Sequence, residues 1–161
     1  MIAFCTGCFD PFHKGHAAFL GYALSFVRKD TDILIVAVNS DDYIRRMKRR
    51  EPFQNEVERL RKVRQYVPCS FLFDNNDPEK LIRAIKPNIY VTGAEYRGKI
   101  DHLEYIVHDA CLGKTVFFDR VGDYSSTKER AKVKYSEAQK MFVNNATHYF
   151  PSTSEAYADR L

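Results

Sequence analysis

Short apolar runs and amphipathic stretches alternate along most of the chain. Five runs rich in Ile, Val, Phe or Tyr predict strands buried on both faces. They span Ile2–Cys8, Asp32–Asn39, Cys69–Asp74, Asn88–Gly93 and Lys114–Asp119. Helical patterns lie between them, at Lys14–Arg28, Ser40–Met47, Glu56–Tyr66, Pro78–Ile85 and His102–Cys111. This alternation predicts an α/β fold: a doubly wound, Rossmann-like parallel five-stranded sheet with helices on both faces.

The alternation stops after about Lys134. We therefore expect one domain over residues 1–134 and a C-terminal extension of unknown role over residues 135–161. With 45% apolar and 29% charged residues, the composition is that of a soluble globular protein. No apolar run approaches the ~20 residues of a membrane span, and the N-terminus does not resemble a signal peptide. The prediction is a cytoplasmic protein with four free cysteines and no membrane partner.

Two clusters of cations stand out from a net charge of only +4. One lies within Arg45–Arg50 and the other within Arg59–Arg64. A solvated helix face explains such runs, and a basic rim around a phosphorylated ligand is the alternative. Nucleic-acid binding is the less favoured explanation, because no recognised nucleic-acid-reading motif accompanies the charge.

The loop after the first strand carries the strongest candidate chemistry. It reads Gly7-Cys8-Phe9-Asp10-Pro11-Phe12-His13-Lys14-Gly15-His16 and leads into the first helix. The two histidines are three residues apart, so they project from nearly the same helix face. A helix N-terminus adds unpaired N–H groups that favour anions, and Gly15 lets a phosphate approach the backbone.

Three explanations compete for the histidine pair. Helix capping and local packing would suffice for an arbitrary pair. Zinc ligation is disfavoured, because zinc pairs on helices usually stand four residues apart with a third ligand nearby. The third explanation is hydrogen bonding to phosphates, with both imidazoles donating to charge that develops during phosphoryl transfer.

This segment resembles the G-x-F-D-x-x-H-x-G-H signature of the cytidylyltransferase-like nucleotidyltransferases. The resemblance implies that His13 and His16 bind a nucleoside triphosphate and act in catalysis. It also implies nucleotide contacts from Gly7, Cys8, Phe9 and Gly15. Asp10 would lie near the acceptor or a metal ion, with helix capping as its structural explanation.

Two later segments are similar to other motifs of this family. The segment Arg120–Thr127 resembles R-T-E-G-I-S-T-T, which implies a catalytic Arg120 and nucleotide contacts from Ser125, Ser126 and Thr127. The segment Thr92–Tyr96 resembles K-G-x-D-[YW], a loop that lies over the base, and implies nucleotide contacts from Gly93, Glu95 and Tyr96. Thr92 and Glu95 replace the family's lysine and aspartate, and Tyr96 either stacks on the base or packs.

The acceptor side resembles the heptose-phosphate nucleotidyltransferase domain. Asn39-Ser40-Asp41 followed by Lys48 matches its N-S-D…L-K pattern, and Arg59 resembles a family arginine on a helix. Asp41 and Arg59 would bind the acceptor. Lys48 would be catalytic on a mobile loop reaching phosphates, or one solvated cation among several.

These resemblances imply an enzyme that transfers a nucleoside monophosphate from an NTP to a phosphorylated polyol or sugar, with Mg²⁺ and release of pyrophosphate. Similarity to glycerol-3-phosphate cytidylyltransferases slightly favours CMP transfer from CTP. The alternative is an ATP-dependent adenylyltransferase acting on a heptose or other sugar phosphate. A second alternative is a nucleotide-binding regulatory module without catalysis. The metal ligands and the oligomeric state stay open, with a homodimer common among such families.

Overall fold

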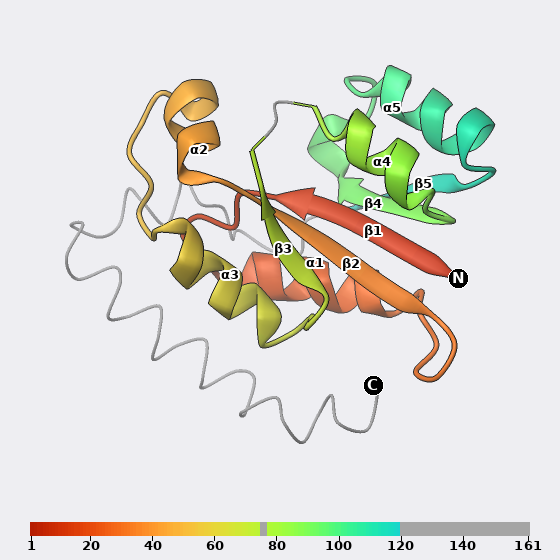
Figure 1. The fold of residues 1–161 in the computed structure, drawn as a ribbon, viewed down its shortest axis with the longest axis horizontal. Coiled ribbons are helices and arrows are strands. Elements are labelled where there is room, and N and C mark those ends of the chain that lie inside the picture. The colour runs from red at the N-terminus through yellow and green to blue at the C-terminus, as the bar shows by residue number, and fades with distance from the viewer. Residues whose placement is uncertain (75–76, 120–161) are drawn as a thin grey trace.

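The computed structural model describes residues 1–74 and 77–119. Five parallel strands form one sheet in the order β3-β2-β1-β4-β5 (Figure 1). They are β1 (Ile2–Gly7), β2 (Ile33–Asn39), β3 (Ser70–Phe73), β4 (Ile89–Gly93) and β5 (Lys114–Phe118). The chain moves outward from β1 to β3 on one side and then crosses to β4 and β5 on the other. The prediction of a doubly wound parallel sheet is confirmed.

The helices also fall where the sequence predicts them, within a few residues. They are α1 (Lys14–Leu24), α2 (Asp41–Lys48), α3 (Glu56–Arg64), α4 (Glu79–Ile85) and α5 (Asp101–Tyr105). A 3₁₀ turn, η1 (Ala94–Tyr96), follows β4, and a π-helical turn, η2 (Ile106–Ala110), continues α5. Pro78 is the N-cap of α4 and not its first residue, and the Asp77 carboxylate accepts from the Glu79 amide.

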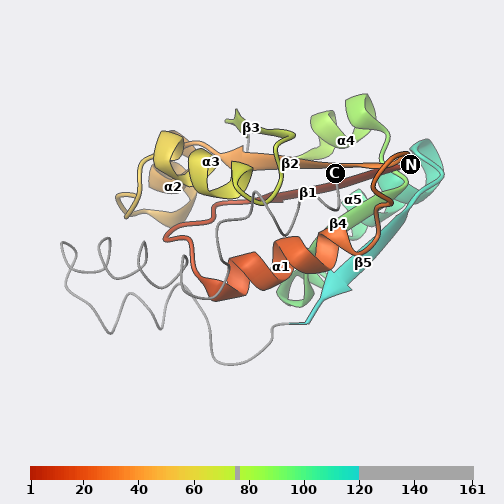
Figure 2. The ribbon, with the colours of Figure 1, turned by 90° about the horizontal axis from the view of Figure 1, so that it is seen from below.

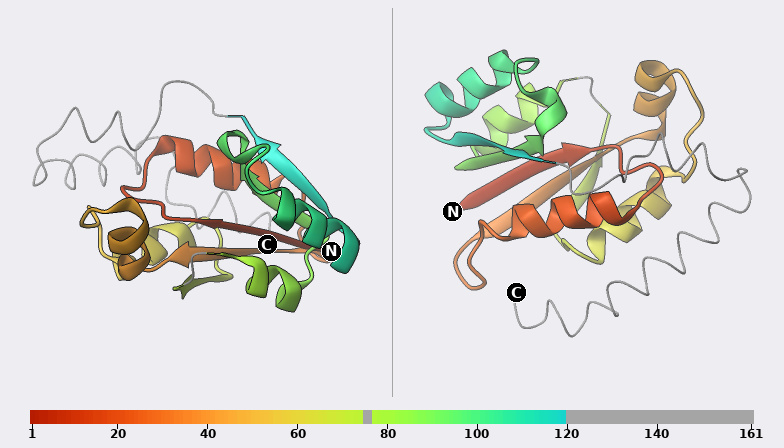
Figure 3. Two further views of the ribbon diagram at one scale, coloured as in Figure 1. Left: turned by 90° about the horizontal axis from the view of Figure 1, so that it is seen from above. Right: turned by 180° about the vertical axis from the view of Figure 1, so that it is seen from behind.

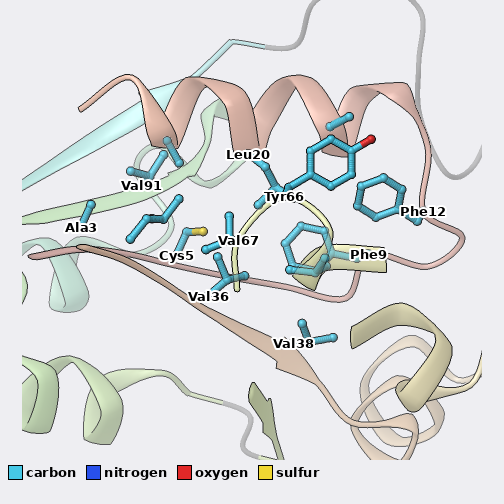
Figure 4. Close-up of a cluster of buried hydrophobic side chains, with 14 of the residues drawn as sticks. Ala3, Cys5, Phe9, Phe12, Leu20, Val36, Val38, Tyr66, Val67 and Val91 are labelled. Carbon is cyan, nitrogen blue, oxygen red and sulfur yellow. The ribbon is translucent and has the colours of Figure 1, made fainter. Parts of the chain in front are cut away.

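Helices cover both faces of the sheet, as Figures 1 and 2 show. Beneath α1 and α3 lies the larger apolar cluster, drawn in Figure 4, which includes Cys5, Leu20, Val36 and Val63. Beneath α4 and α5 lies a second cluster, which includes Phe4, Ile82, Tyr90 and Val107. Alternate residues of β1 and β4 therefore enter opposite cores, as expected for strands buried on both faces.

The strand order reverses between β1 and β4, which are hydrogen-bonded neighbours. In open α/β sheets, ligands bind beyond the carboxyl ends of the strands at this point. The loop that follows β1 and the turn that follows β4 both leave from that edge, and Figure 3 shows the sheet from above and from behind.

All four cysteines carry free thiols, as predicted. Within the described residues, none of the helices is both long and apolar enough to cross a bilayer.

Candidate active site

The loop between β1 and α1 is shaped by a tight contact between Phe9 and Gly7. Phe9 is buried and has a positive φ of 52°. Its ring folds back over Gly7, so that a Cβ at position 7 would lie 2.9 Å from the ring. A non-glycine residue with positive φ is uncommon, and packing of the ring in the larger core holds it there. Gly7 therefore leaves room for the Phe9 ring where the chain leaves the sheet toward α1.

His13 and His16 form the N-terminal cap of α1. The Nδ1 atom of His13 accepts from the Gly15 amide at 3.0 Å, and Nδ1 of His16 accepts from the His13 amide at 3.3 Å. Together they make a reciprocal capping box in which two imidazoles satisfy backbone donors at the helix start. The explanation that the two histidines cap the helix is therefore confirmed.

The same hydrogen bonds determine which ring nitrogens carry protons. A neutral imidazole has one donor and one acceptor nitrogen, and Nδ1 accepts in both rings, so the proton of each is on Nε2. The rings stack with centroids 3.8 Å apart and an interplanar angle of 23°. Two Nε2–H donors side by side at a helix N-terminus suit an anion with several oxygens, such as a phosphate. Capping and phosphate binding are thus compatible.

Asp10 ties this loop to the segment between α2 and α3. Its Oδ1 accepts from the amides of Phe53 and Gln54, both at 2.9 Å, and its Oδ2 accepts from Nη1 of Arg50 at 2.5 Å. The carboxylate is only 2% exposed. Asp10 is therefore not the cap of α1. Its carboxylate is occupied by partners within the protein, so it holds two segments together and does not contact an acceptor in this arrangement.

Gln54 makes a second connection between the same two segments. Its side chain is buried, and Oε1 accepts from the amide of Phe12, the residue before His13, at 3.1 Å. An amide that is 42 residues away in sequence thus helps to place the first histidine. The sequence carries no signal for Gln54, because no local pattern distinguishes it from other polar loop residues, and it indicated Arg50 only as a member of the cation cluster within Arg45–Arg50.

Arg59 is fully buried on α3 and bonds to three segments. It donates to the carbonyl oxygens of Gln54, Cys8 and Asn39 at 2.9, 2.5 and 2.8 Å. Its fourth bond, from Nη2 to Oδ1 of Asp41 at 2.7 Å, is an ion pair. The acceptor-binding prediction for Arg59 is therefore wrong for direct contact, since a buried guanidinium with these partners cannot reach a ligand. Asp41 is mainly its counter-ion.

The cation cluster on α2 is largely neutralised by neighbouring carboxylates. Arg45 pairs with Asp42 and Glu51, and Arg46 pairs with Asp74. Arg50 pairs with Asp10. In the part of the chain that the structure describes, Lys48 has no ion pair and is exposed at the end of α2. The surface is thus mostly ion-paired, with Lys48 as a remaining cation near the candidate site.

Cys8 lies among the cations of this edge. Its thiol donates to Oδ1 of Asn39 at 3.7 Å. Burial raises the pKa of the thiol, while the positive charges of Lys48, Arg59 and Arg50, in that order, oppose the shift. Lys48 therefore lies close enough to Cys8, the residue after β1, to act on the charge of its thiolate.

The turn after β4 brings Gly93, Glu95 and Tyr96 to the same edge of the sheet. The Glu95 carboxylate folds back onto Gly93, where an added Cβ would lie 2.2 Å from Oε2, so a larger residue at position 93 would displace this flexible side chain. Glu95 and Tyr96 are exposed, Tyr96 to 43%. Their predicted nucleotide contacts stay a prediction. Arg120, Ser125, Ser126 and Thr127 lie outside the described residues, as do residues 135–161.

Among the described residues, no three His, Cys, Asp or Glu side chains are grouped to hold a metal ion. Mg²⁺ usually keeps several water ligands and binds through one or two carboxylates together with substrate phosphates. Asp10 and Asp41 are already engaged by arginines. The donor set therefore fits a Mg²⁺ ion that arrives with a nucleotide and not one held in a protein cage.

Comparison with known proteins adds evidence independent of this geometry. A family model described as cytidylyltransferase-like matches residues 4–132. The chain is 42% identical over 101 residues to the bifunctional protein HldE of Helicobacter pylori (strain HPAG1), covering 61% of this chain and 21% of that protein. It is 35% identical over 141 residues to HldE of Alcanivorax borkumensis, covering 83% of this chain and 28% of the relative. The chain thus spans less than a third of the length of these relatives.

Two solved structures share the fold. One is a lipopolysaccharide core biosynthesis protein from Thermoplasma volcanium, with a TM-score of 0.58, 26% identity and coverage of 78% of this chain and 98% of that one. The other is a protein with unknown function from Archaeoglobus fulgidus, with a TM-score of 0.58, 17% identity and coverage of 78% and 95%. At 17% identity, the second likeness shows the fold alone.

Proposed function

Because this chain belongs to the cytidylyltransferase-like family of nucleotidyltransferases, we propose that it transfers a nucleoside monophosphate from an NTP to a sugar phosphate. The observation that carries this proposal is the stacked pair His13 and His16 at the start of α1, with both Nε2–H groups as donors. An anion-binding helix start at the switch point of a parallel sheet supports triphosphate binding.

In the proposed reaction, a phosphate oxygen of the acceptor attacks the α-phosphorus of the NTP. The new P–O bond forms as the bond to the β-phosphate oxygen breaks, and pyrophosphate leaves with the electron pair. His13 and His16 donate hydrogen bonds to the phosphates as charge develops, and the α1 N-terminus orients them. Lys48 and Arg120 supply positive charge. A bound Mg²⁺ would neutralise phosphate charge, held mainly by the triphosphate itself.

ATP is the donor that we propose. The sequence alone slightly favoured CTP, but the relatives named HldE support the adenylyl alternative, which the middle of the chain also resembles. The name of the Thermoplasma relative, a lipopolysaccharide core biosynthesis protein, supports a sugar phosphate as acceptor. Glu95 fits either base, because both adenine and cytosine carry an exocyclic amine that a carboxylate accepts.

The proposal is tested by measuring pyrophosphate release with ATP or CTP against a panel of phosphorylated acceptors. The panel contains glycerol phosphate, heptose phosphate and other sugar phosphates. We expect release with ATP and a sugar phosphate, and little with CTP. Release only with CTP and glycerol phosphate would reverse the choice of branch. Nucleotide binding without release from any pair would indicate a regulatory module instead of an enzyme.

A further inference from the structure

The side of the sheet beneath α4 and α5 ends in a row of uncharged polar side chains. Phe4 and Tyr90 lie in the α4–α5 core, and side chains alternate along a strand. Thr6 and Cys8 therefore lie on the same side of the sheet as Phe4, closer to its carboxyl edge. Thr92 lies on the same side as Tyr90. Asn39 follows Ala37 in the same way. We call Thr6, Cys8, Asn39, Tyr90 and Thr92 the neutral row.

Contacts between neighbouring strands confirm that these side chains lie on one side. The hydroxyls of Thr6 and Tyr90 are 3.4 Å apart, and the Cys8 thiol is 3.7 Å from Oδ1 of Asn39. Thr6 and Cys8 are half-buried and reach solvent. Thr92 is 7% exposed, and its hydroxyl has no hydrogen-bond partner among the described residues. The Thr92 hydroxyl is not one of the fully buried polar atoms that lack a partner in the described part of the chain, so it is open to a partner from outside the chain.

Two tyrosines approach the neutral row from opposite directions. Tyr43 is half-buried on α2, which follows β2, and Tyr96 is on η1, which follows β4. The pKa of Tyr43 is raised to about 12, first by burial and then by the proximity of Cys8 and Tyr96. The hydroxyl of Tyr43 also has no hydrogen-bond partner within residues 1–74 and 77–119, which leaves it a donor at physiological pH.

The charges around the row limit what it can bind. The row itself is neutral, and Thr92 stands where the resembling motif has a lysine. Arg50 and Arg59 are each paired with a carboxylate, whereas Lys48 acts on Cys8 and has no ion pair in the described part of the chain. Of the described cations, Lys48 acts on Cys8, so it is the one placed to bind a phosphate beside the row. A phosphate directly over the neutral row would lose hydration without a charged partner from the row itself.

We propose that the neutral row and Tyr43 bind the uncharged, polyhydroxylated body of a sugar monophosphate, whose phosphate lies on the Lys48 side. The inference rests on the proposed function, in which a sugar phosphate is the acceptor. It moves the acceptor site away from Asp10 and Arg59, which are internal, and onto hydroxyls and an amide that pair with sugar hydroxyls in either hydrogen-bonding direction. It also predicts that a sugar monophosphate is a better acceptor than a sugar bisphosphate.

Kinetics of three hydroxyl deletions test this site. Tyr43→Phe and Thr92→Val each remove one hydroxyl at nearly constant volume. Tyr105→Phe is the control, because Tyr105 is an exposed residue of α5 whose hydroxyl bonds to Asp109 and is not part of the row. We expect the KM for a sugar monophosphate to rise about 3- to 10-fold in each of the first two variants, as one lost hydrogen bond implies. The KM for ATP and the thermal midpoint should stay unchanged, and Tyr105→Phe should change nothing. Thr92→Lys should improve the use of a sugar bisphosphate.

Shielding of Cys8 from a thiol reagent tests the site without any turnover. Alkylation of each cysteine is followed by peptide mass spectrometry in the intact protein. A sugar monophosphate should slow alkylation of Cys8 and leave that of the exposed Cys69 unchanged. Inorganic phosphate serves as the comparison, because it carries the charge without the hydroxyls.

The two experiments separate this inference from the proposed function. Turnover of a sugar monophosphate with unchanged KM in both Tyr43→Phe and Thr92→Val overturns the site but keeps the function. Shielding of Cys8 without pyrophosphate release from any acceptor supports the site and overturns the function. Equal shielding by inorganic phosphate overturns the assignment to a sugar body. If Cys8 is not shielded and no acceptor is turned over, both the site and the function are overturned.

Discussion

Removing the guanidinium of Arg59 should be among the most damaging single changes in the chain. Arg59→Met keeps an apolar stem of similar length in a fully buried position but deletes four hydrogen bonds. The carbonyls of Cys8, Asn39 and Gln54 lose their charged donor, and Asp41 loses its counter-ion. Breaking a buried ion pair from one side costs about 3–5 kcal/mol. That is a large part of the roughly 5–15 kcal/mol by which a domain is stable.

Urea denaturation measures this loss as a change in the free energy of unfolding. We expect Arg59→Met to lower it by about 3–5 kcal/mol. Arg61→Met is the matched control, because Arg61 is an exposed arginine on the same helix. This variant should change the free energy of unfolding by less than about 0.5 kcal/mol. Adding Asp41→Asn to Arg59→Met should recover part of the loss, since it removes the uncompensated carboxylate. A loss below about 1 kcal/mol for Arg59→Met would refute the reasoning.

Three further changes probe the histidine loop, the backbone and a buried tyrosine. His16→Ala should lower turnover about 100-fold or more through lost charge stabilisation. It should cost only about 0.5–2 kcal/mol of stability through the lost cap, and a steady-state assay beside urea melts separates the two effects. Gly113→Ala should lower the melting temperature, because its Cβ would lie 2.4 Å from the Pro87 carbonyl oxygen, whereas Gly21→Ala in α1 meets nothing and should raise it. Burial raises the pKa of Tyr90 to about 12, so its stabilising contribution is complete below about pH 10 and is lost as the pH rises toward 12. Alkaline unfolding monitored by circular dichroism should therefore begin at higher pH in Tyr90→Phe, and identical curves would contradict that account.

The arrangement of the histidine pair was predictable because the hydrogen bonds between the two residues and their own helix turn are local. His13 and His16 contact each other and the amides of their own helix turn, within three residues in sequence. Spacing along the chain is enough to place such groups on one helix face. The strands were also predictable from the sequence, because burial on both faces makes each strand a continuous apolar run.

The roles of Asp10, Asp41 and Arg59 were not predictable in the same way. Each was expected to contact an acceptor, but their carboxylate and guanidinium groups bond within the protein. The partners are far apart in sequence: 44 residues separate Asp10 from Gln54, and 51 separate Arg59 from Cys8. A charged residue in a polar loop looks the same in sequence whether it binds a ligand or a neighbouring segment.

The sequence by itself determined the element order, the parallel sheet and the capped histidine pair, because these depend on periodicity and on contacts within one helix turn. Only the tertiary structure decided which polar groups at the carboxyl edge are internal and which reach solvent. That choice depends on how three loops pack around Arg59 and Asp10. Folding buries the charges of Asp10 and Arg59 with their partners, whereas Lys48 is exposed and Thr6, Cys8 and Tyr43 are partly exposed.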